Sequence, residues 1–282
     1  MHDPTATLIA LALAEDIGEG DVTAHYFIPE ARRACAFVAV RQDGVISGVE
    51  LAARVFSTLD PLLKVEVLIP NGSRVAAGAL LIRVEGSARS ILTAERTALN
   101  FLQRLSGVAS LTARYVEQVK GTRTRILDTR KTTPGYRALE KQAVADGGGT
   151  NHRHGLFDRA MVKDNHLVTE GGTAAIQAAI LRLKAEKPEV EIELEADHLD
   201  QVRTFLTLKG VDHILLDNMT VEELKTAVSM RGDRNWPQFE ASGGITLATL
   251  QEIAETGVDF ISVGALTHSA PALDIGLDFE VI

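Results

Sequence analysis

Cationic side chains gather in one stretch of an otherwise acidic chain. The 282 residues carry a formal net charge of -9, yet Arg130, Lys131, Arg153 and Lys163 lie close together in the sequence. A guanidinium binds a carboxylate or a phosphate through two parallel hydrogen bonds, and an ammonium adds a point charge. Because such cations repel one another when no anion is present, their grouping predicts a pocket for a multiply charged anionic ligand.

The same cations could instead belong to a solvated loop surface, paired with Glu140, Asp146 and Asp158. For any one of them alone this is the better interpretation, since most Lys and Arg side chains do no more. We favour the pocket because all four follow or flank predicted strand ends, where the fold would bring them together.

Carboxylates replace the cations in the second half. Glu195 and Asp217 end successive predicted strands, and Asp197 lies nearby. Such groups could hold ribose hydroxyls, bind Mg²⁺ through water or stabilise a cationic sugar. An acid/base pair for glycoside hydrolysis is also conceivable. Surface salt bridges are the alternative, and for Asp197 they carry equal weight.

Two glycine-containing turns follow the last two predicted strands, at Ser242-Gly243-Gly244 and Val263-Gly264-Ala265. Backbone N–H groups at such turns favour phosphate, and glycine permits close approach. One Gly-Gly pair is weak evidence, because ordinary turns use it. Two on the last strands predict a phosphate site, since barrel enzymes bind phosphate there.

The histidines His152, His154, His166 and His268 show no zinc-binding spacing. We predict that His152, beside the cations, binds substrate, whereas His166 and His268 could equally be structural. The single cysteine, Cys35, cannot form an internal disulfide and is expected to be buried and inert. This favours a reducing compartment, and we expect the cytoplasm.

The acidic balance, with a pI near 5.4, argues against a nucleic-acid or anionic-membrane surface. The amino terminus is apolar from Leu8 to Leu13 but lacks a basic region and a cleavage site, so a short helix is expected rather than a signal. No run reaches the roughly 18 to 20 apolar residues that cross a bilayer. We therefore expect a soluble protein.

Beyond residue 122, short apolar strands alternate with helical patterns. The predicted strands are Thr124–Leu127, Ala160–Val162, Val190–Leu194, His213–Leu216, Gln238–Ala241 and Phe260–Val263. The predicted helices include Ala174–Ala185, Leu199–Leu208, Val221–Met230 and Leu247–Thr256. This alternation predicts parallel strands with right-handed crossovers. Each strand delivers polar groups to its carboxyl end, which favours a barrel, and the length allows six strands rather than eight.

The first part of the chain has a different pattern of predicted strands and helices. Strands are predicted at Cys35–Val40, Lys64–Ile69 and Leu80–Val84, with a helix over 48–59 between the first two. A helix is predicted over Ser90–Leu105, with Ser90 as N-cap and Gly107 as its stop, bridging two domains. A second helix is expected over Leu111–Lys120.

At this point the sequence closely resembles the quinolinate phosphoribosyltransferase family, over nearly its whole length. The motifs that carry the resemblance are Glu15 to Thr23, Ala94 to Asn100, Leu105-Ser106-Gly107, Asp128 to Pro134, Gly147 to Gly149 with Asn151 to Arg153, Lys163 to His166, Glu195, Leu215 to Asn218, Glu240 to Ile245 and Val263 to Ser269. A molybdenum-utilisation protein shares this fold, so fold alone would not identify the reaction. The cationic set favours a dicarboxylate.

The resemblance implies a site for each of two substrates. Quinolinate lies among Thr129, Arg130, His152, Arg153 and Lys163, with Arg96 reaching in from a neighbouring subunit of a homodimer. Phosphoribosyl pyrophosphate contacts Lys131, Glu195, Asp217, Ser242, Gly243, Gly244, Val263, Gly264, Ala265 and His268. Of these, Lys131, Glu195 and Asp217 are expected to be catalytic. Mg²⁺ would enter with phosphoribosyl pyrophosphate, near Glu195 and Asp217, and no organic cofactor is expected.

The implied fold class is α/β: an N-terminal α/β sandwich domain over residues 1–110 and an open six-stranded α/β barrel over 111–267. The tail, 268–282, is expected to pack on the first domain. The implied reaction joins quinolinate to phosphoribosyl pyrophosphate with loss of carbon dioxide, giving nicotinate mononucleotide for NAD synthesis. A phosphoribosyltransferase for another acceptor, such as nicotinate, and a non-catalytic phosphate-ligand sensor are the alternatives.

Overall fold

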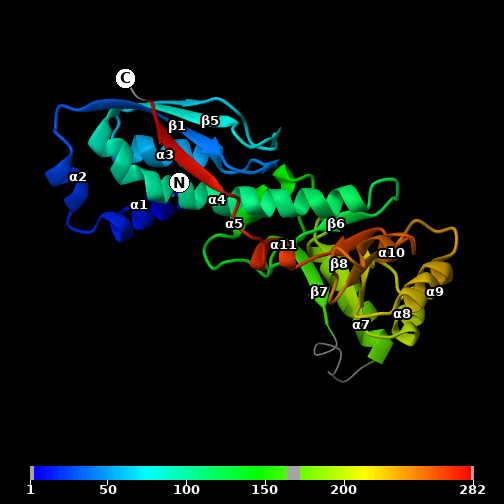
Figure 1. Ribbon diagram of the computed structural model, residues 1–282. Coiled ribbons are helices and arrows are strands. Elements are labelled where there is room, and N and C mark those ends of the chain that lie inside the picture. Colours follow the sequence, from blue (N-terminus) through cyan, green and yellow to red (C-terminus); the bar gives the residue numbers. More distant parts are fainter. Residues whose placement is uncertain (1–2, 164–171, 281–282) are drawn as a thin grey trace. The chain divides into compact units, whose positions relative to one another are not determined.

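The structure is a computed structural model, and it describes residues 3–163 and 172–280. The chain forms two compact units (Figure 1). Unit 1 comprises Met1–Leu111 with Ala145–Gly148 and Ala270–Ile282, and unit 2 comprises Thr112–Val144 with Gly149–Ser269. Within the described residues, every helix is too short or too polar to span a membrane.

Unit 1 is built on a four-stranded antiparallel sheet in the order β12-β1-β5-β3. Its strands are β1 (Arg33–Val40), β3 (Lys64–Val67), β5 (Leu80–Ser87) and β12 (Ile275–Phe279), and a small second sheet pairs β2 (Gly44–Val45) with β4 (Arg74–Val75). The helices α1 (Pro4–Ile17), α2 (Val22–Phe27) and α3 (Val49–Leu59) precede or separate these strands. The last strand, β12, pairs with β1, so residues from both ends of the sequence share one sheet.

One long helix, α4 (Ala88–Gln118), replaces the two helices predicted for this stretch. Ser90 is not the N-cap, because the helix begins at Ala88 and the Ser87 hydroxyl oxygen accepts the Ser90 N–H at 3.3 Å, while the Ser90 hydroxyl donates to Asp60 at 2.7 Å. Gly107 does not stop the helix either. A Cβ at Gly107 would lie 2.0 Å from the Pro271 carbonyl oxygen, so the glycine makes room for the C-terminal segment of unit 1. A helix tolerates one interior glycine at a cost of about 1 kcal/mol.

Unit 2 contains six parallel strands in the order β6-β11-β10-β9-β8-β7. They are β6 (Arg125–Leu127), β7 (Arg159–Val162), β8 (Glu191–Ala196), β9 (His213–Asp217), β10 (Gln238–Ser242) and β11 (Phe260–Ser262). The helices of this part are α5 (Arg137–Asp146), α7 (Gly172–Glu186), α8 (Leu199–Phe205), α9 (Val221–Arg231), α10 (Leu250–Ala254) and α11 (Ala265–His268). The described strands β6 and β7 stand at the two ends of this order and do not pair with each other, so the sheet is open, and the predicted fold class is confirmed.

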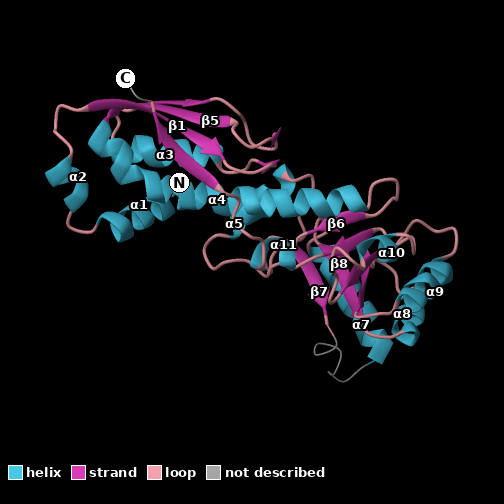
Figure 2. Ribbon diagram, in the orientation of Figure 1, coloured by secondary structure: helices cyan, strands magenta, loops and turns pink. Residues whose placement is uncertain are grey.

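The two faces of this sheet differ in chemistry. On β8 the residues Ile192 and Leu194 are buried and apolar, whereas Glu193 and Glu195 alternate with them. Successive side chains on a strand point to opposite faces, so the glutamates share one face, here called the inner face. The apolar residues lie on the other, outer face, next to the helices that Figure 2 shows flanking the strands.

Candidate active site

A pocket of about 320 Å³ lies at the carboxyl ends of the unit 2 strands. Nine of its lining residues were predicted from the sequence: Thr129, Arg130, Lys131, His152, Arg153, Lys163, Glu195, Asp217 and Ser242. Met161, Leu215, Glu240 and Ser262 complete the lining. The strand ends thus bring together residues separated by more than one hundred positions in the sequence.

Two guanidinium groups dominate one side of the pocket. The Nε atom of Arg130 is buried and has no hydrogen-bond partner among the described residues. Arg153 donates from Nη1 to the Arg159 carbonyl at 3.2 Å. Burial lowers the pKa of Arg153, and the nearby charge of Arg130 lowers it further. A guanidinium is not deprotonated in proteins. The pocket therefore presents positive charge that an anion would stabilise.

The acids near these cations accept hydrogen bonds from other groups, although the charge of Asp158 also raises the pKa of Arg153. Glu140 accepts hydrogen bonds from the Thr133 backbone N–H at 3.0 Å and from its hydroxyl at 2.9 Å. Asp158 accepts the backbone N–H groups of His154, at 2.6 Å, and Gly155, at 2.9 Å. Asp146 accepts the Ser47 hydroxyl at 2.6 Å, within unit 1. These contacts organise loops, which argues against the solvated-surface interpretation of Arg130, Lys131 and Arg153.

Lys163 is the cation that has a carboxylate partner. Its Nζ lies 2.8 Å from Glu195 Oε2, and Glu195 is almost fully buried. Asp217 accepts a hydrogen bond from the Asn218 amide at 2.7 Å. One carboxylate oxygen from each of Glu195, Asp197 and Asp217 lies within 4.8 Å of the others, a set that could hold a metal ion. Asp197, for which the sequence left two interpretations open, thus lies beside the two predicted acids.

The glycines of the two turns lie next to this pocket, whereas Ser242 of the first turn lines it. Gly243 has φ of 99°, and a Cβ there would lie 2.1 Å from Asn218 Oδ1, so only glycine fits. A Cβ on Gly264 would lie 3.1 Å from Lys131 Cδ and 3.2 Å from His268 Nε2. The Gly264 turn, the Lys131 side chain and His268 are therefore neighbours. Gly244, Val263 and Ala265 lie on the same two turns.

A buried ion pair that the sequence did not predict joins the two cationic loops. Lys141 and Asp128 are fully buried and form a short salt bridge. Asp128 Oδ1 also accepts the His152 N–H at 2.9 Å, and Lys141 Nζ donates to the His152 carbonyl at 2.9 Å. Burial raises the pKa of Asp128 and lowers that of Lys141, and each partner opposes this effect on the other. The pair fixes the start of the Thr129–Lys131 loop against His152 and Arg153.

Two further carboxylates were missed. Glu193 and Glu240 are fully buried on the inner face, next to His152. The alternation in Glu191-Ile192-Glu193-Leu194-Glu195 was the available signal, because it puts three glutamates on one face of a strand.

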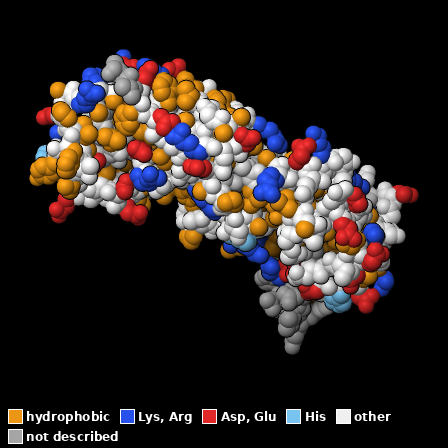
Figure 3. All heavy atoms as spheres, in the orientation of Figure 1, with side chains coloured by type: hydrophobic (Ala, Val, Ile, Leu, Met, Phe, Trp, Pro, Cys, Tyr) orange, Lys and Arg blue, Asp and Glu red, His pale blue; other side chains and the backbone are white. Residues whose placement is uncertain are grey.

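Not every predicted site residue lies in unit 2. Arg96 is exposed on α4 within unit 1. His166, with the adjacent Asp164 and Asn165 of its motif, lies outside the described residues. Figure 3 shows acidic and basic side chains interspersed over the face in view, without a continuous basic band there.

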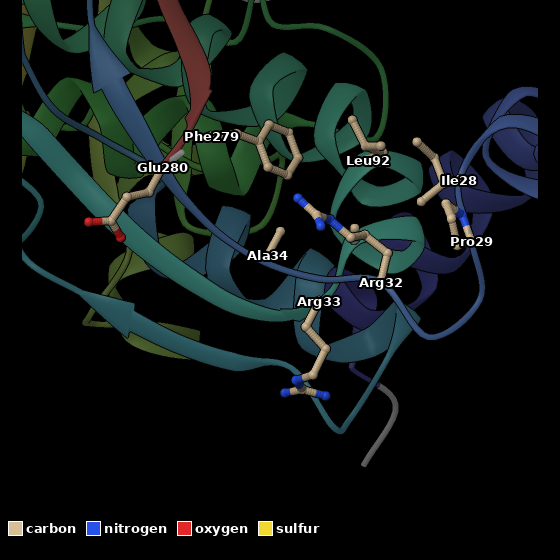
Figure 4. A pocket seen from close by; sticks show the side chains of 9 residues that line it. Ile28, Pro29, Arg32, Arg33, Ala34, Leu92, Phe279 and Glu280 are labelled. Atoms are coloured by element: carbon tan, nitrogen blue, oxygen red, sulfur yellow. The ribbon is translucent and has the colours of Figure 1, made fainter. Parts of the chain in front are cut away.

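Unit 1 has a larger pocket, of about 530 Å³, lined by Ile28, Pro29, Arg32, Arg33, Ala34, Ala88, Leu92, Phe279 and Glu280. Figure 4 shows the Arg32 guanidinium reaching toward the Phe279 ring, while Arg33 points away. None of the predicted site residues lines this pocket, and its charged lining residues are Arg32, Arg33 and Glu280. Size alone therefore does not identify the active site.

Comparison with known proteins adds an independent line of evidence. Residues 108–278 match the family described as Quinolinate phosphoribosyl transferase, C-terminal domain, and residues 21–106 match Quinolinate phosphoribosyl transferase, N-terminal domain. A quinolinate phosphoribosyltransferase [decarboxylating] of Nicotiana tabacum, named as mitochondrial, is 41% identical over 97% of this chain and 81% of its own length. The nicotinate-nucleotide pyrophosphorylase [carboxylating] of Mycobacterium leprae is 41% identical, covering 98% of this chain and 97% of the relative.

A solved structure agrees with these matches. The nicotinate-nucleotide pyrophosphorylase from Francisella tularensis superposes with a TM-score of 0.91 at 38% identity, covering 99% of this chain and 96% of the other. The similarity therefore extends over both units.

Proposed function

Because this chain belongs to the quinolinate phosphoribosyltransferase family, we propose that it transfers phosphoribosyl from phosphoribosyl pyrophosphate to quinolinate with decarboxylation. The products are nicotinate mononucleotide, carbon dioxide and pyrophosphate, and the reaction serves NAD synthesis.

The observation that carries this proposal is the division of charge within one pocket. Arg130 and Arg153 form its cationic side, and the buried Arg130 Nε has no partner among the described residues. Glu195 and Asp217 form its acidic side. A dicarboxylate fits the first side, because guanidinium groups bind carboxylates in a bidentate way. A ribose that develops positive charge fits the second.

Each group of pocket residues has a separate role in the reaction. Lys131, beside the Gly264 turn, neutralises the leaving pyrophosphate. Glu195 and Asp217 hold the ribose and stabilise its oxocarbenium character as the bond to pyrophosphate breaks. Arg130, Arg153 and Lys163 hold the two carboxylates so that the ring nitrogen faces the anomeric carbon. Once the nitrogen is bonded to ribose, the positive charge of the ring stabilises the carbanion that the departing carbon dioxide leaves on the adjacent ring carbon, and this carbon then takes up a proton from the solvent.

Mg²⁺ would arrive with phosphoribosyl pyrophosphate, next to Glu195 and Asp217, and would supply further neutralisation of the pyrophosphate charge. The acidic donor set there suits a hard cation that prefers oxygen ligands. The quinolinate ring is its own electron sink, so the reaction requires no organic cofactor.

The working protein, in this proposal, is a homodimer. Arg96 is exposed on α4, and its side chain would complete the quinolinate pocket of a second copy. The free, buried thiol of Cys35 is compatible with a reducing compartment, and the cytoplasm is the proposed location.

The test measures release of ¹⁴C-labelled carbon dioxide and formation of nicotinate mononucleotide from quinolinate, phosphoribosyl pyrophosphate and Mg²⁺. Equal amounts of the two products are expected from quinolinate, and none from nicotinate under the same conditions. Nicotinate as the preferred acceptor would assign the chain to another phosphoribosyltransferase activity. Tight binding of both substrates without turnover would make it a sensor.

Two variants link the result to this pocket. Lys131→Ala is expected to lower kcat by about 100-fold or more, as removal of a preorganised charge-stabilising group does. Lys225→Ala, a lysine on the outer helix α9 that pairs with Glu222, serves as the matched control and should retain full activity. Equal loss in both variants would contradict the assignment of Lys131.

A further inference from the structure

Two loops of unit 2 bring Arg130 and Arg153 into the active-site pocket. We call residues 129–133 the first loop and residues 152–155 the second loop. Burial lowers the pKa of Arg153, and the charge of Arg130 lowers it further, so the two guanidinium groups repel each other. Contacts elsewhere in the protein must therefore hold the loops together while no anion is bound.

One side chain of α5 makes contacts of this kind with both loops. Arg137, the first residue of α5, donates from Nε to the Thr132 hydroxyl at 3.0 Å and from Nη1 to the His154 carbonyl at 2.9 Å. A longer hydrogen bond, of 3.5 Å, joins its Nη2 to the Arg130 carbonyl. The guanidinium of Arg137 thus connects the first loop to the second through neutral oxygen atoms.

Other residues on the same face of α5 reach the same loops. Residues three and four positions apart on a helix are neighbours on its surface, as Glu140 and Lys141 are to Arg137. Glu140 accepts both the N–H and the hydroxyl of Thr133 in the first loop, and Lys141 donates to the His152 carbonyl of the second at 2.9 Å. One face of α5 is therefore devoted to the two loops.

The two guanidinium groups of the pocket are held in different ways. Arg153 is fixed by its side chain, since Nη1 donates to the Arg159 carbonyl at 3.2 Å and Nη2 to Met161 Sδ at 3.3 Å, both on β7. Arg130 lacks such an anchor at Nε, which is buried and has no hydrogen-bond partner among the described residues. The position of Arg130 therefore depends on its backbone, whose carbonyl accepts the long hydrogen bond from Arg137.

We propose that Arg137 is a positioning residue for the acceptor: it holds the first and second loops at the separation at which Arg130 and Arg153 bind two neighbouring carboxylates. This inference rests on the proposed function for the identity of the acceptor. Arg137 is not among the residues that line the pocket, so it acts through the loops without touching the substrate. Loops that are already in place lose less conformational freedom on binding, which strengthens the binding of the acceptor.

The chemistry of arginine suits this role. Its planar guanidinium donates in several fixed directions, whereas a lysine ammonium is a point charge on a flexible stem. A glutamine amide offers two N–H donors and no charge, so it could not replace all three hydrogen bonds of Arg137. These differences allow the hydrogen bonds and the charge of Arg137 to be tested separately.

The first experiment compares the steady-state kinetics of the wild type, Arg137→Gln and Arg137→Lys. Arg137→Gln should raise the KM for quinolinate by about 10-fold, because hydrogen bonds from a charged group are lost and the loops separate. The kcat and the KM for phosphoribosyl pyrophosphate should change by less than about 2-fold, since binding of the acceptor alone is weakened. Arg137→Lys should recover only part of the KM, and full recovery would overturn the proposal, because the charge alone would then suffice.

Ligands with a single carboxylate distinguish positioning from a general loosening of unit 2. Pyridine-2-carboxylate and pyridine-3-carboxylate can each follow the one loop that binds them, so the spacing of the loops matters less. Their inhibition constants should change by less than about 3-fold in Arg137→Gln, and equal losses for one-carboxylate and two-carboxylate ligands would overturn the proposal. Arg203→Gln is the matched control, because Arg203 is an exposed arginine on α8 that pairs with Asp200. Its kinetic constants should equal those of the wild type.

Thr132→Val tests the same connection while Arg137 stays in place. It removes the hydroxyl that accepts from Arg137 Nε, so the KM for quinolinate should rise by about 3-fold. In the Arg137→Gln background it should have little further effect, because both changes break one contact. Additive effects, or a lower free energy of unfolding with an unchanged KM in Arg137→Gln, would overturn the proposal and make Arg137 a structural residue. Absence of quinolinate turnover in the wild type would instead overturn the proposed function.

Discussion

The two faces of the unit 2 sheet carry different kinds of side chain, although they are formed by the same strands. The outer face carries Ile192, Leu194, Ile214, Leu216, Phe239 and Ile261, all buried. The inner face carries Glu193, Glu195, His213, Asp217 and Glu240 at alternating positions. Burial of apolar side chains stabilises the fold, whereas burial of ionisable groups costs free energy unless they are paired.

This difference shows which buried charged groups lower the stability of the fold and can bind a ligand. The pair of Asp128 and Lys141 and the group of His152, Glu193 and Glu240 each satisfy some of their charges internally. Arg130 Nε stays without a partner among the described residues. An anion bound in the pocket would therefore recover free energy that folding alone does not, and substitutions on the two faces should separate stability from activity.

The largest expected effect belongs to the outer face. Phe239 is fully buried, and the Arg231 guanidinium lies 4.8 Å from its ring centroid. Phe239→Ala should lower the free energy of unfolding by about 3–5 kcal/mol, because it removes a large buried side chain and leaves a cavity. Urea denaturation measures the loss. The KM for quinolinate should remain that of the wild type in the folded protein.

Phe239→Leu is the control for this substitution, since it keeps most of the buried volume and should cost clearly less. A change in quinolinate KM comparable to the loss of stability would break the comparison, because it would mean that the outer face also shapes the pocket.

An inner-face loop should give the reverse pattern. Arg130→Ala removes a guanidinium that approaches the ligand, and hydrogen bonds to charged groups contribute about 1.5–3 kcal/mol. The KM for quinolinate should rise by about 10–100-fold, with the free energy of unfolding unchanged or increased, because the half-buried side chain that is removed has a buried Nε without a hydrogen-bond partner among the described residues. Steady-state kinetics measures the KM, and urea denaturation of the same preparation measures the free energy of unfolding.

Arg130→Lys keeps the positive charge but loses the planar fork, so it should recover only part of the affinity. If Arg130→Ala destabilised the protein as much as Phe239→Ala does, Arg130 would be a structural residue and the division between the faces would fail.

The sequence predicted the outer face better than the inner one. Apolar alternation located all six strands of unit 2 within a few residues, because a strand that packs on helices must repeat with a period of two. The strand ends also located Arg130, Lys163, Glu195 and Asp217. Strand order is a property of long-range pairing, so no local pattern revealed that β6 lies beside β11.

The misses have identifiable physical causes. Lys141 occurs in a helical stretch where a lysine is normally exposed, and only the fold shows that it is buried against Asp128. Glu193 and Glu240 lie beside His152, which comes from a loop far away in sequence, so their proximity cannot be read from either strand alone. The sequence predicts a helix stop at Gly107, which is wrong because close packing of a distant segment against a helix leaves no signal in the helix itself. Polar residues at the end of a single strand can be predicted from the sequence. Contacts among side chains from three different elements cannot.

The smallest expected effect tests a residue that belongs to neither face. Thr220 is the N-cap of α9: its hydroxyl accepts the Glu223 N–H at 3.3 Å, and Glu223 Oε2 accepts the Thr220 N–H at 2.8 Å. Thr220→Ala should lower the free energy of unfolding by about 1 kcal/mol, because one end of the helix loses its capping hydrogen bond. Thr220→Ser preserves the cap and should stay near the wild type. Thermal denaturation resolves the two variants, and kinetic constants for both substrates should be equal in all three proteins. A change in kcat or in either KM for Thr220→Ala would show that the helices outside the sheet influence the pocket, and the stability of the outer layer would then be coupled to the chemistry of the inner one.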